Sequence, residues 1–134
     1  ITPAAGFVGI GGAIAIGVIV SLVCFFAVSH IKPKLGYDDT LDAFGVHGVG
    51  GIIGAVATGI FATPAIQGAY SGLLSGNPKQ LLIQLLATGV TLVYSGVITF
   101  ILFKIIDKTS GIRVDDRIEE EGLDIYEHGE SAYN

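Results

Sequence analysis

The chain has 134 residues, of which only 14% are charged, and its mean hydropathy is +0.69. Soluble domains carry about 25% charged residues, so most of this chain has no water to face. The formal net charge is −5, and eight of the 12 acidic residues lie from Asp115 onward, which leaves the remainder nearly neutral. This distribution gives no reason to expect nucleic-acid binding, and the 20 glycines are typical of packed membrane helices.

The amino-terminal residues favour a piece of a longer protein. Methionine is absent, and residues 1–8 (ITPAAGFV) have the character of the end of an earlier span and a turn, because Pro3 and Gly6 interrupt regular structure. No basic stretch precedes the first apolar run, so we do not expect a signal peptide. Cys24 is the only cysteine and lies in an apolar run, where a small packing residue is expected.

Three stretches are long and apolar enough to cross a membrane. They cover residues 9–29, 41–62 and 80–103, and a bilayer core of about 30 Å needs about 20 apolar residues in a helix. Backbone groups in lipid must be paired within the segment, so helices are expected. We therefore predict an all-α membrane protein with a transmembrane region at residues 1–110 and a short tail at residues 111–134.

Polar and conformationally restricted residues mark the breaks between these spans. The KPK sequence around Pro33 predicts the end of the first span, because proline lacks a backbone donor and restricts its predecessor. Residues 38–40, two aspartates and a threonine, offer N-capping groups for the second span, which should end at Thr63 and Pro64. The connection that follows is rich in Gly, Ser, Asn and Pro, and should form a surface loop with one helical turn at residues 69–74.

The distribution of basic residues orients the spans through the positive-inside rule. The first connection contains Lys32 and Lys34, whereas the second contains only Lys79. Four basic residues follow the third span, at positions 104, 108, 113 and 117. The first connection and the carboxyl terminus should therefore face the cytoplasm, and we expect a multi-pass protein of the cell (inner) membrane.

The second and third spans differ in bulk. The third has 14 Leu, Ile, Val or Phe residues between Leu81 and Phe103, whereas the second has only eight between Ala43 and Ala62, together with six glycines. A span so poor in bulk should pack against other helices, because its small residues let backbones approach closely. These small residues form two rows, Gly50 with Gly54, and Gly51 with Ala55 and Gly59.

His47 is an ionisable residue well inside the second span. It lies about 9 Å past Leu41 along a helix, a depth at which such residues usually face the protein interior or a water-filled path. Three roles stay open: a pore residue, a neutral histidine hydrogen-bonded across helices, or a metal ligand. No second ligand lies at a usable spacing, which disfavours the metal. On a regular helix its face also holds Ala43, Phe44, Gly50, Gly51 and Gly54.

Several stretches resemble the ammonium transporters of the Amt/Mep/Rh family, in the family's order and spacing. The string DDTLDAFGVHGVGGI at residues 38–52 closely resembles the signature of the tenth of eleven helices in Amt proteins, and ITPAAGFVGIGGA resembles the junction between the eighth and ninth. KLGYDD resembles the cytoplasmic turn before the tenth helix, and GIRV and EEEGLDIYEHGESAY resemble the cytoplasmic tail. The resemblance implies a carboxyl-terminal fragment that holds the last three transmembrane helices of an eleven-helix bundle.

The resemblance also implies transport of ammonium or ammonia through a hydrophobic pore lined by a pair of histidines. His47 matches the second of that pair, and the first belongs to the fifth helix, outside these 134 residues. Ala43 matches a lumen-lining position that is often valine in relatives. Thr2 matches a threonine that faces the lumen, with a plain helix-end residue as the alternative. No cofactor, metal or catalytic residue is implied.

Asp39 and Asp42 lie at the start of the second span. One interpretation is that they cap this helix and interact with its dipole. The other is a weak cation site in the cytoplasmic vestibule, because they would lie at the pore mouth.

The tail alternates apolar and acidic residues, so an amphipathic docked segment and a solvated disordered tail are both possible readings. The resemblance implies a tail that docks beneath its own and a neighbouring subunit of a homotrimer and responds to a PII-type signalling protein. The apolar residues that would pack inward are Ile112, Val114, Ile118, Leu123, Ile125 and Tyr126.

Two other functions compete with an Amt-type transporter. An Rh-like gas channel is disfavoured by the DDTLDAFGVHGVGG string and the tail, and an ammonium sensor is disfavoured because no signalling domain precedes Asn134. An enzyme is not expected, because the sequence has no nucleophile paired with a base, no metal cluster and no phosphate-binding loop.

Overall fold

The computed structural model describes residues 2–130, and every regular element among them is helical. Three helical stretches are long and apolar enough to span a membrane: Ile10–Leu35, Phe44–Phe61 and Pro78–Ser110. The prediction of an all-α protein with three spans is therefore confirmed. The chain forms two compact units, Ile1–Leu92 and Val93–Asn134, and the long third helix contributes to both.

The first span is a continuous helix built from three pieces. Helix α1 (Ile10–Phe26) passes into the π-helical turn η2 (Ala27–Ile31) and then into α2 (Lys32–Leu35). The helix ends at Gly36, whose φ of 63° lies in the left-handed region that glycine adopts readily. The last residue of the helix is Leu35, one residue past the KPK sequence that was predicted to end it, and the helix extends beyond residue 29, the predicted end of the span, through the π turn and Pro33.

The second span starts later than predicted. Asp42 has a φ of 54° and interrupts the backbone, so the helix begins with the π-helical turn η3 (Phe44–Gly48) and continues as α3 (Val49–Phe61). Its end before Thr63 and Pro64 agrees with the prediction. Five residues of α3 are buried, and all are small or short: Gly50, Gly54, Ala57, Thr58 and Gly59.

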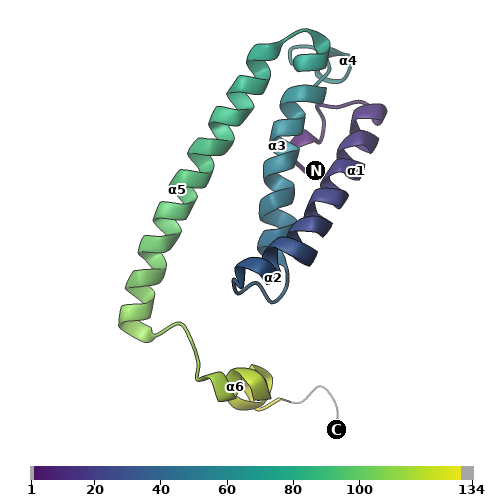
Figure 1. Ribbon diagram of the computed structural model, residues 1–134. Coiled ribbons are helices and arrows are strands. Elements are labelled where there is room, and N and C mark those ends of the chain that lie inside the picture. Colours follow the sequence, from purple (N-terminus) through teal and green to yellow (C-terminus); the bar gives the residue numbers. More distant parts are fainter. Residues whose placement is uncertain (1, 131–134) are drawn as a thin grey trace. The chain divides into compact units, whose positions relative to one another are not determined.

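Helices α1 and α3 pack side by side, with the short 3-10 turn η1 (Thr2–Ala4) against α3 (Figure 1). The buried centre of this packing is Ile16 of α1 together with Ala4 and Ala57. A Cβ built on Gly50 would lie 3.3 Å from Cys24 Sγ, so this glycine lets the two backbones approach. The predicted packing role of Gly50 and Gly54 is confirmed by their burial.

The connection between the second and third spans is folded by backbone hydrogen bonds. The Thr63 N–H donates to the Phe7 carbonyl at 2.9 Å, and the Gly72 N–H donates to the Ala62 carbonyl at 2.8 Å. Two short helical turns form in this connection, α4 (Pro64–Gln67) and η4 (Leu73–Ser75), and η4 overlaps the end of the range 69–74 where one turn was predicted. The carbonyl of Ala62, the residue that follows α3, thus finds its partners within the connection.

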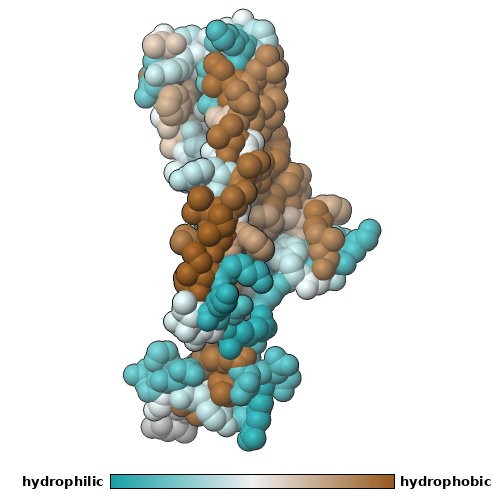
Figure 2. Space-filling view, turned by 90° about the vertical axis from the view of Figure 1, so that its left-hand side faces the viewer, coloured by the Kyte–Doolittle hydropathy of each residue, from teal (hydrophilic) through white to brown (hydrophobic). Residues whose placement is uncertain are grey.

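Helix α5 (Pro78–Ser110) is the third span and extends beyond both predicted ends. None of its residues is buried, and bulky apolar side chains run along most of its length. Figure 2 shows these side chains as a continuous hydrophobic band along the helix. An exposed apolar helix of this length suits contact with lipid or with further membrane helices.

The tail forms two short helices, α6 (Asp116–Glu121) and α7 (Leu123–His128). Arg113 pairs with Glu119 at 2.9 Å, and Arg117 pairs with Glu121 at 2.8 Å. The Tyr126 hydroxyl donates to Glu121 at 2.6 Å, which links α7 to α6. Over its described residues, up to 130, the tail contains these two helices. Docking of the tail stays a prediction, because Ile112, Leu123, Ile125 and Tyr126 are exposed within this chain.

Candidate functional site

An open cavity of about 460 Å³ lies between α1, the turn η1 and the second span. It brings together His47 and Thr2, which are 45 positions apart (47 minus 2) and were both predicted as lumen-lining residues. The remaining lining residues are small or apolar: Pro3, Gly17, Val20, Ser21, Cys24, Val46, Gly50 and Gly51. No lining residue carries a fixed charge, so the cavity is a neutral environment for a small solute.

His47 lies in the π-helical turn η3, and its side chain is exposed to this cavity. Within residues 2–130 the imidazole has no hydrogen-bond partner, so both ring nitrogens are open to one. Turns of π-helix are rare and are often found at functional sites, because one extra residue changes the direction of the side chains. The local backbone therefore presents His47 as the main polar group of the cavity.

The opposite wall of the cavity comes from α1, whose contribution the sequence reasoning missed. Gly17, Ser21 and Cys24 line it at helical spacing, so one face of the first span is small and weakly polar. The Ser21 hydroxyl donates to the Gly17 carbonyl at 2.8 Å, and the Cys24 thiol faces the Val46 carbonyl at 3.6 Å. This spacing of small residues in an otherwise bulky helix was the signal available in the sequence.

Ala43 does not line the cavity. It precedes the π-helical turn η3, whereas the regular-helix face predicted for His47 assumed 3.6 residues per turn throughout. Gly50 and Gly51, on the α-helical side of His47, do line the cavity as that face predicted. Gly54, on the same α-helical side and on the same predicted face, is buried and does not line the cavity, and the lumen position of Ala43 stays a prediction.

Asp39 and Asp42 make different contacts at the start of the second span. The N–H groups of Phe44 and Gly45 donate to Asp39 Oδ2 at 3.0 and 3.1 Å, which are the contacts of a helix cap. Partial burial opposes ionisation of Asp39, but hydrogen bonds from Gly45, Phe44 and Ala43 outweigh it and hold the pKa of this carboxyl below its usual value. Asp42 instead pairs with Lys32, with Oδ1 and Nζ 2.6 Å apart.

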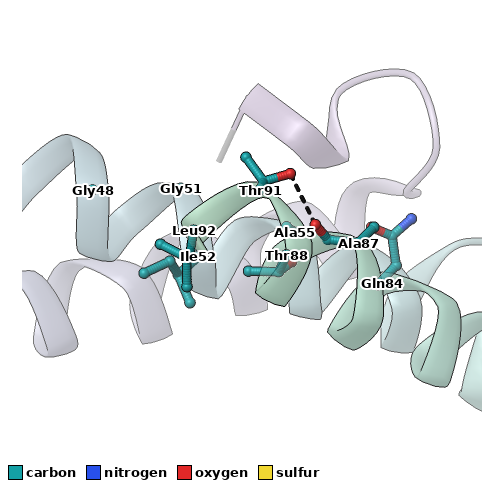
Figure 3. Close-up of a pocket in the computed structure, with 9 residues that line it drawn as sticks. All are labelled: Gly48, Gly51, Ile52, Ala55, Gln84, Ala87, Thr88, Thr91 and Leu92. Atoms are coloured by element: carbon teal, nitrogen blue, oxygen red, sulfur yellow. Dashed lines mark hydrogen bonds between the residues drawn. The ribbon is translucent and has the colours of Figure 1, made fainter. Parts of the chain in front are cut away.

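A second cavity, of about 350 Å³, lies between α3 and the first part of α5 (Figure 3). Gly51 lines this cavity as well as the one with His47, so the small residues of the second span border open space on two sides. The Thr91 hydroxyl donates to the Ala87 carbonyl at 2.8 Å, which pairs its proton within its own helix. Other lining residues are Gly48, Ile52, Ala55, Gln84, Thr88 and Leu92.

Comparison with known proteins identifies the family. The model of the Ammonium Transporter Family matches residues 1–133. The chain belongs to this family. An ammonium transporter of Aquifex aeolicus is 52% identical over 134 residues, which are 100% of this chain and 31% of that protein. Ammonium transporter Amt1 of Archaeoglobus fulgidus is 48% identical, over 99% of this chain and 34% of its own length.

A solved structure agrees with this assignment. The crystal structure of Saccharomyces cerevisiae Mep2 superposes with a TM-score of 0.80 at 35% sequence identity, covering 87% of this chain and 28% of the Mep2 chain. Family membership and the three apolar spans make the chain part of a multi-pass membrane protein. The relatives are named as transporters, which are not enzymes.

The chain spans about a third of the length of the curated relatives it matches. Among the described residues, the cavity beside His47 has a neutral lining of mostly small side chains.

Proposed function

We propose that the complete protein containing this chain transports ammonium or ammonia across a membrane and that His47 lines the path. The observation that carries the proposal is the exposed imidazole in a neutral cavity of a membrane span, with Thr2 in the same cavity. An ionisable side chain at such a position usually faces a substrate path. Membership of the ammonium transporter family supplies the substrate class.

The chemistry of the cavity suits a small solute that can exchange protons. Neutral imidazole donates from one nitrogen and accepts at the other, so it can hydrogen-bond ammonia or relay a proton. A path without carbonyl or carboxylate rings removes the hydration shell of potassium or sodium without replacing it, which excludes these ions.

His47 acts in this proposal as one member of a histidine pair. The second imidazole comes from an earlier helix of the complete protein, as the family resemblance implies. Ala43 and Thr2 contribute further lumen positions. Ala43 lies before the π turn, so we place it nearer the cytoplasmic end of the path than His47. Asp39 and Asp42 lie beyond it, at the cytoplasmic mouth.

The proposal extends to topology and assembly. The carboxyl terminus faces the cytoplasm, since the first connection and the residues after α5 carry most of the basic residues. The complete protein resides in the cell membrane as a homotrimer, and its tail responds to a PII-type signalling protein. Helices α6 and α7 give this tail a folded surface. Removing residues 111–134 should lower transport without preventing membrane insertion, and full activity of that deletion would contradict a regulatory tail.

The test compares ammonium uptake in cells that lack their own ammonium transporters. The complete gene product is expressed as the parent, as His47→Ala, and as His30→Ala, at equal membrane abundance. His30 is the matched control, because it is also a histidine of a membrane span but stacks on Phe26 and does not line the cavity. We expect loss of uptake or of ion selectivity in His47→Ala alone.

Two results would contradict the proposal. Selective, parent-level uptake by His47→Ala would make this histidine a structural residue. Absence of uptake by the parent itself would favour the alternative of an ammonium sensor.

A further inference from the structure

Lys32 connects the last turn of the first span to the residues that precede His47. Its ammonium Nζ donates to the Asp39 backbone carbonyl at 2.5 Å and to Asp42 Oδ1 at 2.6 Å. The side chains of Lys32 and Asp42 are 25% and 35% exposed, so water covers only part of the pair. Charge-assisted hydrogen bonds of this length are among the stronger contacts of a folded chain.

The turn that Lys32 holds is also the turn that starts the helix of His47. The carboxylate of Asp39 accepts the N–H groups of Phe44 and Gly45, and the Asp42 carbonyl accepts the Val46 N–H at 2.8 Å. The first turn of the helix that contains His47 is therefore hydrogen-bonded to Asp39 and Asp42, the two residues that Lys32 contacts. A change at Lys32 reaches the backbone of His47 through these bonds.

The backbone at Asp42 needs such support. Its φ of 54° lies in the left-handed region, which residues other than glycine seldom adopt, although aspartate does so more readily than most. Strained positions of this kind persist where the surrounding contacts hold them. The ion pair with Lys32 is the contact that fixes the Asp42 side chain.

The two π-helical turns pack directly against each other. Gly45 of η3 lies so close to η2 that a Cβ built on it would be 2.7 Å from Cγ2 of Val28. The two turns therefore leave no room for η3 to move closer to η2 at Gly45. Lys32 follows η2 immediately in sequence, and its contacts with Asp39 and Asp42 join this end of η2 to the residues before η3.

We propose that Lys32 is a positioning residue for His47: by clasping the turn between Asp39 and Asp42 it fixes where the second span begins and hence where the imidazole lies. This inference rests on the proposed transport path, since it assigns His47 its place in that path. Lys32 itself does not line the cavity and touches no substrate.

The first experiment compares Lys32→Gln with Lys34→Gln in the complete protein. Both substitutions remove one positive charge from the same connection, so they change the orientation signal equally. Lys34 is exposed, and among the described residues it has no hydrogen bond or ion pair. We expect Lys32→Gln to lower the maximal uptake rate by roughly tenfold, since a misplacement of about 1 Å at a site can cost up to about 100-fold, while Lys34→Gln stays near the parent.

A second measurement does not depend on transport. Histidine labelled with nitrogen-15 reports the environment of the His47 imidazole by solid-state NMR in proteoliposomes, with His47→Gln identifying its signal. We expect Lys32→Gln to shift or broaden that signal and Lys34→Gln to leave it unchanged. Lys32→Arg, which keeps a cation within reach of Asp42, should restore most of the uptake and the parent signal.

The outcomes separate the two proposals. Equal effects of Lys32→Gln and Lys34→Gln, or an unchanged His47 signal in Lys32→Gln, would overturn the positioning role. An active His47→Ala protein would overturn the transport role of His47 while the NMR comparison still decides whether Lys32 positions it. If Lys32→Gln fails to reach the membrane, Asp42→Asn removes the same ion pair without changing the basic residues, and a parent-like His47 signal there would overturn the role.

Discussion

The second and third spans differ in how much of each is buried against the rest of the chain. In the span Phe44–Phe61 a third of the residues are buried, whereas in the span Pro78–Ser110 none are. The first is built from glycine and alanine against α1, and the second presents Leu, Ile, Val and Phe outward. Because lipid provides no hydrophobic force between helices, the packed helix depends on close van der Waals contact, which small residues allow. The exposed helix instead carries large apolar side chains that suit contact with lipid.

The difference also separates the site from the scaffold. Cavities border Gly48, Gly51 and Ala55 of the second span because their side chains fill little space. The same lack of bulk gives His47 an accessible imidazole. Leu and Ile side chains at these positions would fill the cavities. The small residues that make the second span poorly suited to face lipid therefore leave the space beside His47 open.

The largest expected effect is a charge on the exposed helix. Val93 is 69% exposed in the middle of α5, and a lysine at the centre of a span costs about 2.5–3.5 kcal/mol of insertion free energy. We expect Val93→Lys to reduce the membrane-inserted fraction, measured in a translocon insertion assay, while Val93→Leu inserts normally. Normal insertion of the lysine variant would show that this side of α5 faces protein or water.

A smaller effect is expected when bulk is added to the packed helix. A Cβ on Gly59 would lie 2.9 Å from the Leu81 Cα, whereas a Cβ on Gly89 of α5 meets nothing within 4 Å. We expect Gly59→Val to destabilise the protein by about 1–3 kcal/mol, and Gly89→Val to change little. Thermal unfolding in detergent measures the stability of both variants. Equal melting temperatures for Gly59→Val and Gly89→Val would contradict the proposal that the second span is packed and the third is not.

The contrast between the spans was predictable, because it depends on composition alone. Counting bulky residues identified the second span as packed, and the spacing of Gly50 and Gly54 predicted a close approach of helices, which Gly50 makes to Cys24 of α1. The ends of the helices were less predictable. The helix continues through Pro33 and ends two residues later at Leu35, because the π-helical turn that ends at Ile31 precedes the proline with one residue between them.

The site was predictable in part. His47 and Thr2 line one cavity, as the family resemblance implied, but the contribution of Ser21 and Cys24 needs the packing of α1 on the second span. The contact of Lys32 with Asp42 spans ten residues and requires both the extended first helix and the left-handed backbone at Asp42. Sequence patterns report periodicity within an element, and these contacts arise between elements.

A more subtle change tests whether small residues of the second span serve packing or space. A Cβ on Gly51 meets nothing within 4 Å, and this residue borders both cavities. We expect Gly51→Ala to raise helix stability by up to about 1 kcal/mol, yet to lower ammonium uptake by narrowing the cavity beside His47. Uptake at equal membrane abundance, with thermal unfolding as the companion measurement, checks this, and unchanged uptake would assign Gly51 no role in the path.

The smallest expected effects concern the tail, whose contacts are ion pairs and hydrogen bonds between exposed side chains. Hydrogen bonds from Arg117 and then Tyr126 hold the pKa of Glu121 below its usual 4.5, and the hydrogen bond to Glu121 together with burial raises the pKa of Tyr126 above its usual 10.0. A lowered carboxyl pKa means that the contribution of Glu121 is complete above pH 4.5 and is lost as the pH falls through the lowered value. A raised phenol pKa means that the contribution of Tyr126 is complete below pH 10.0 and is lost as the pH rises through the raised value.

The Tyr126–Glu121 contact can be measured by titrating tyrosine absorbance in the complete protein, with Tyr126→Phe subtracted to isolate one phenol. We expect Glu121→Gln to return the pKa of Tyr126 toward its ordinary value, because the carboxylate that accepts its proton is gone. Glu120→Gln is the matched control, since it removes one charge from the same helix at a residue that Tyr126 does not contact. Equal shifts in the two variants would mean that the general acidity of the tail, rather than the contact between α6 and α7, controls Tyr126.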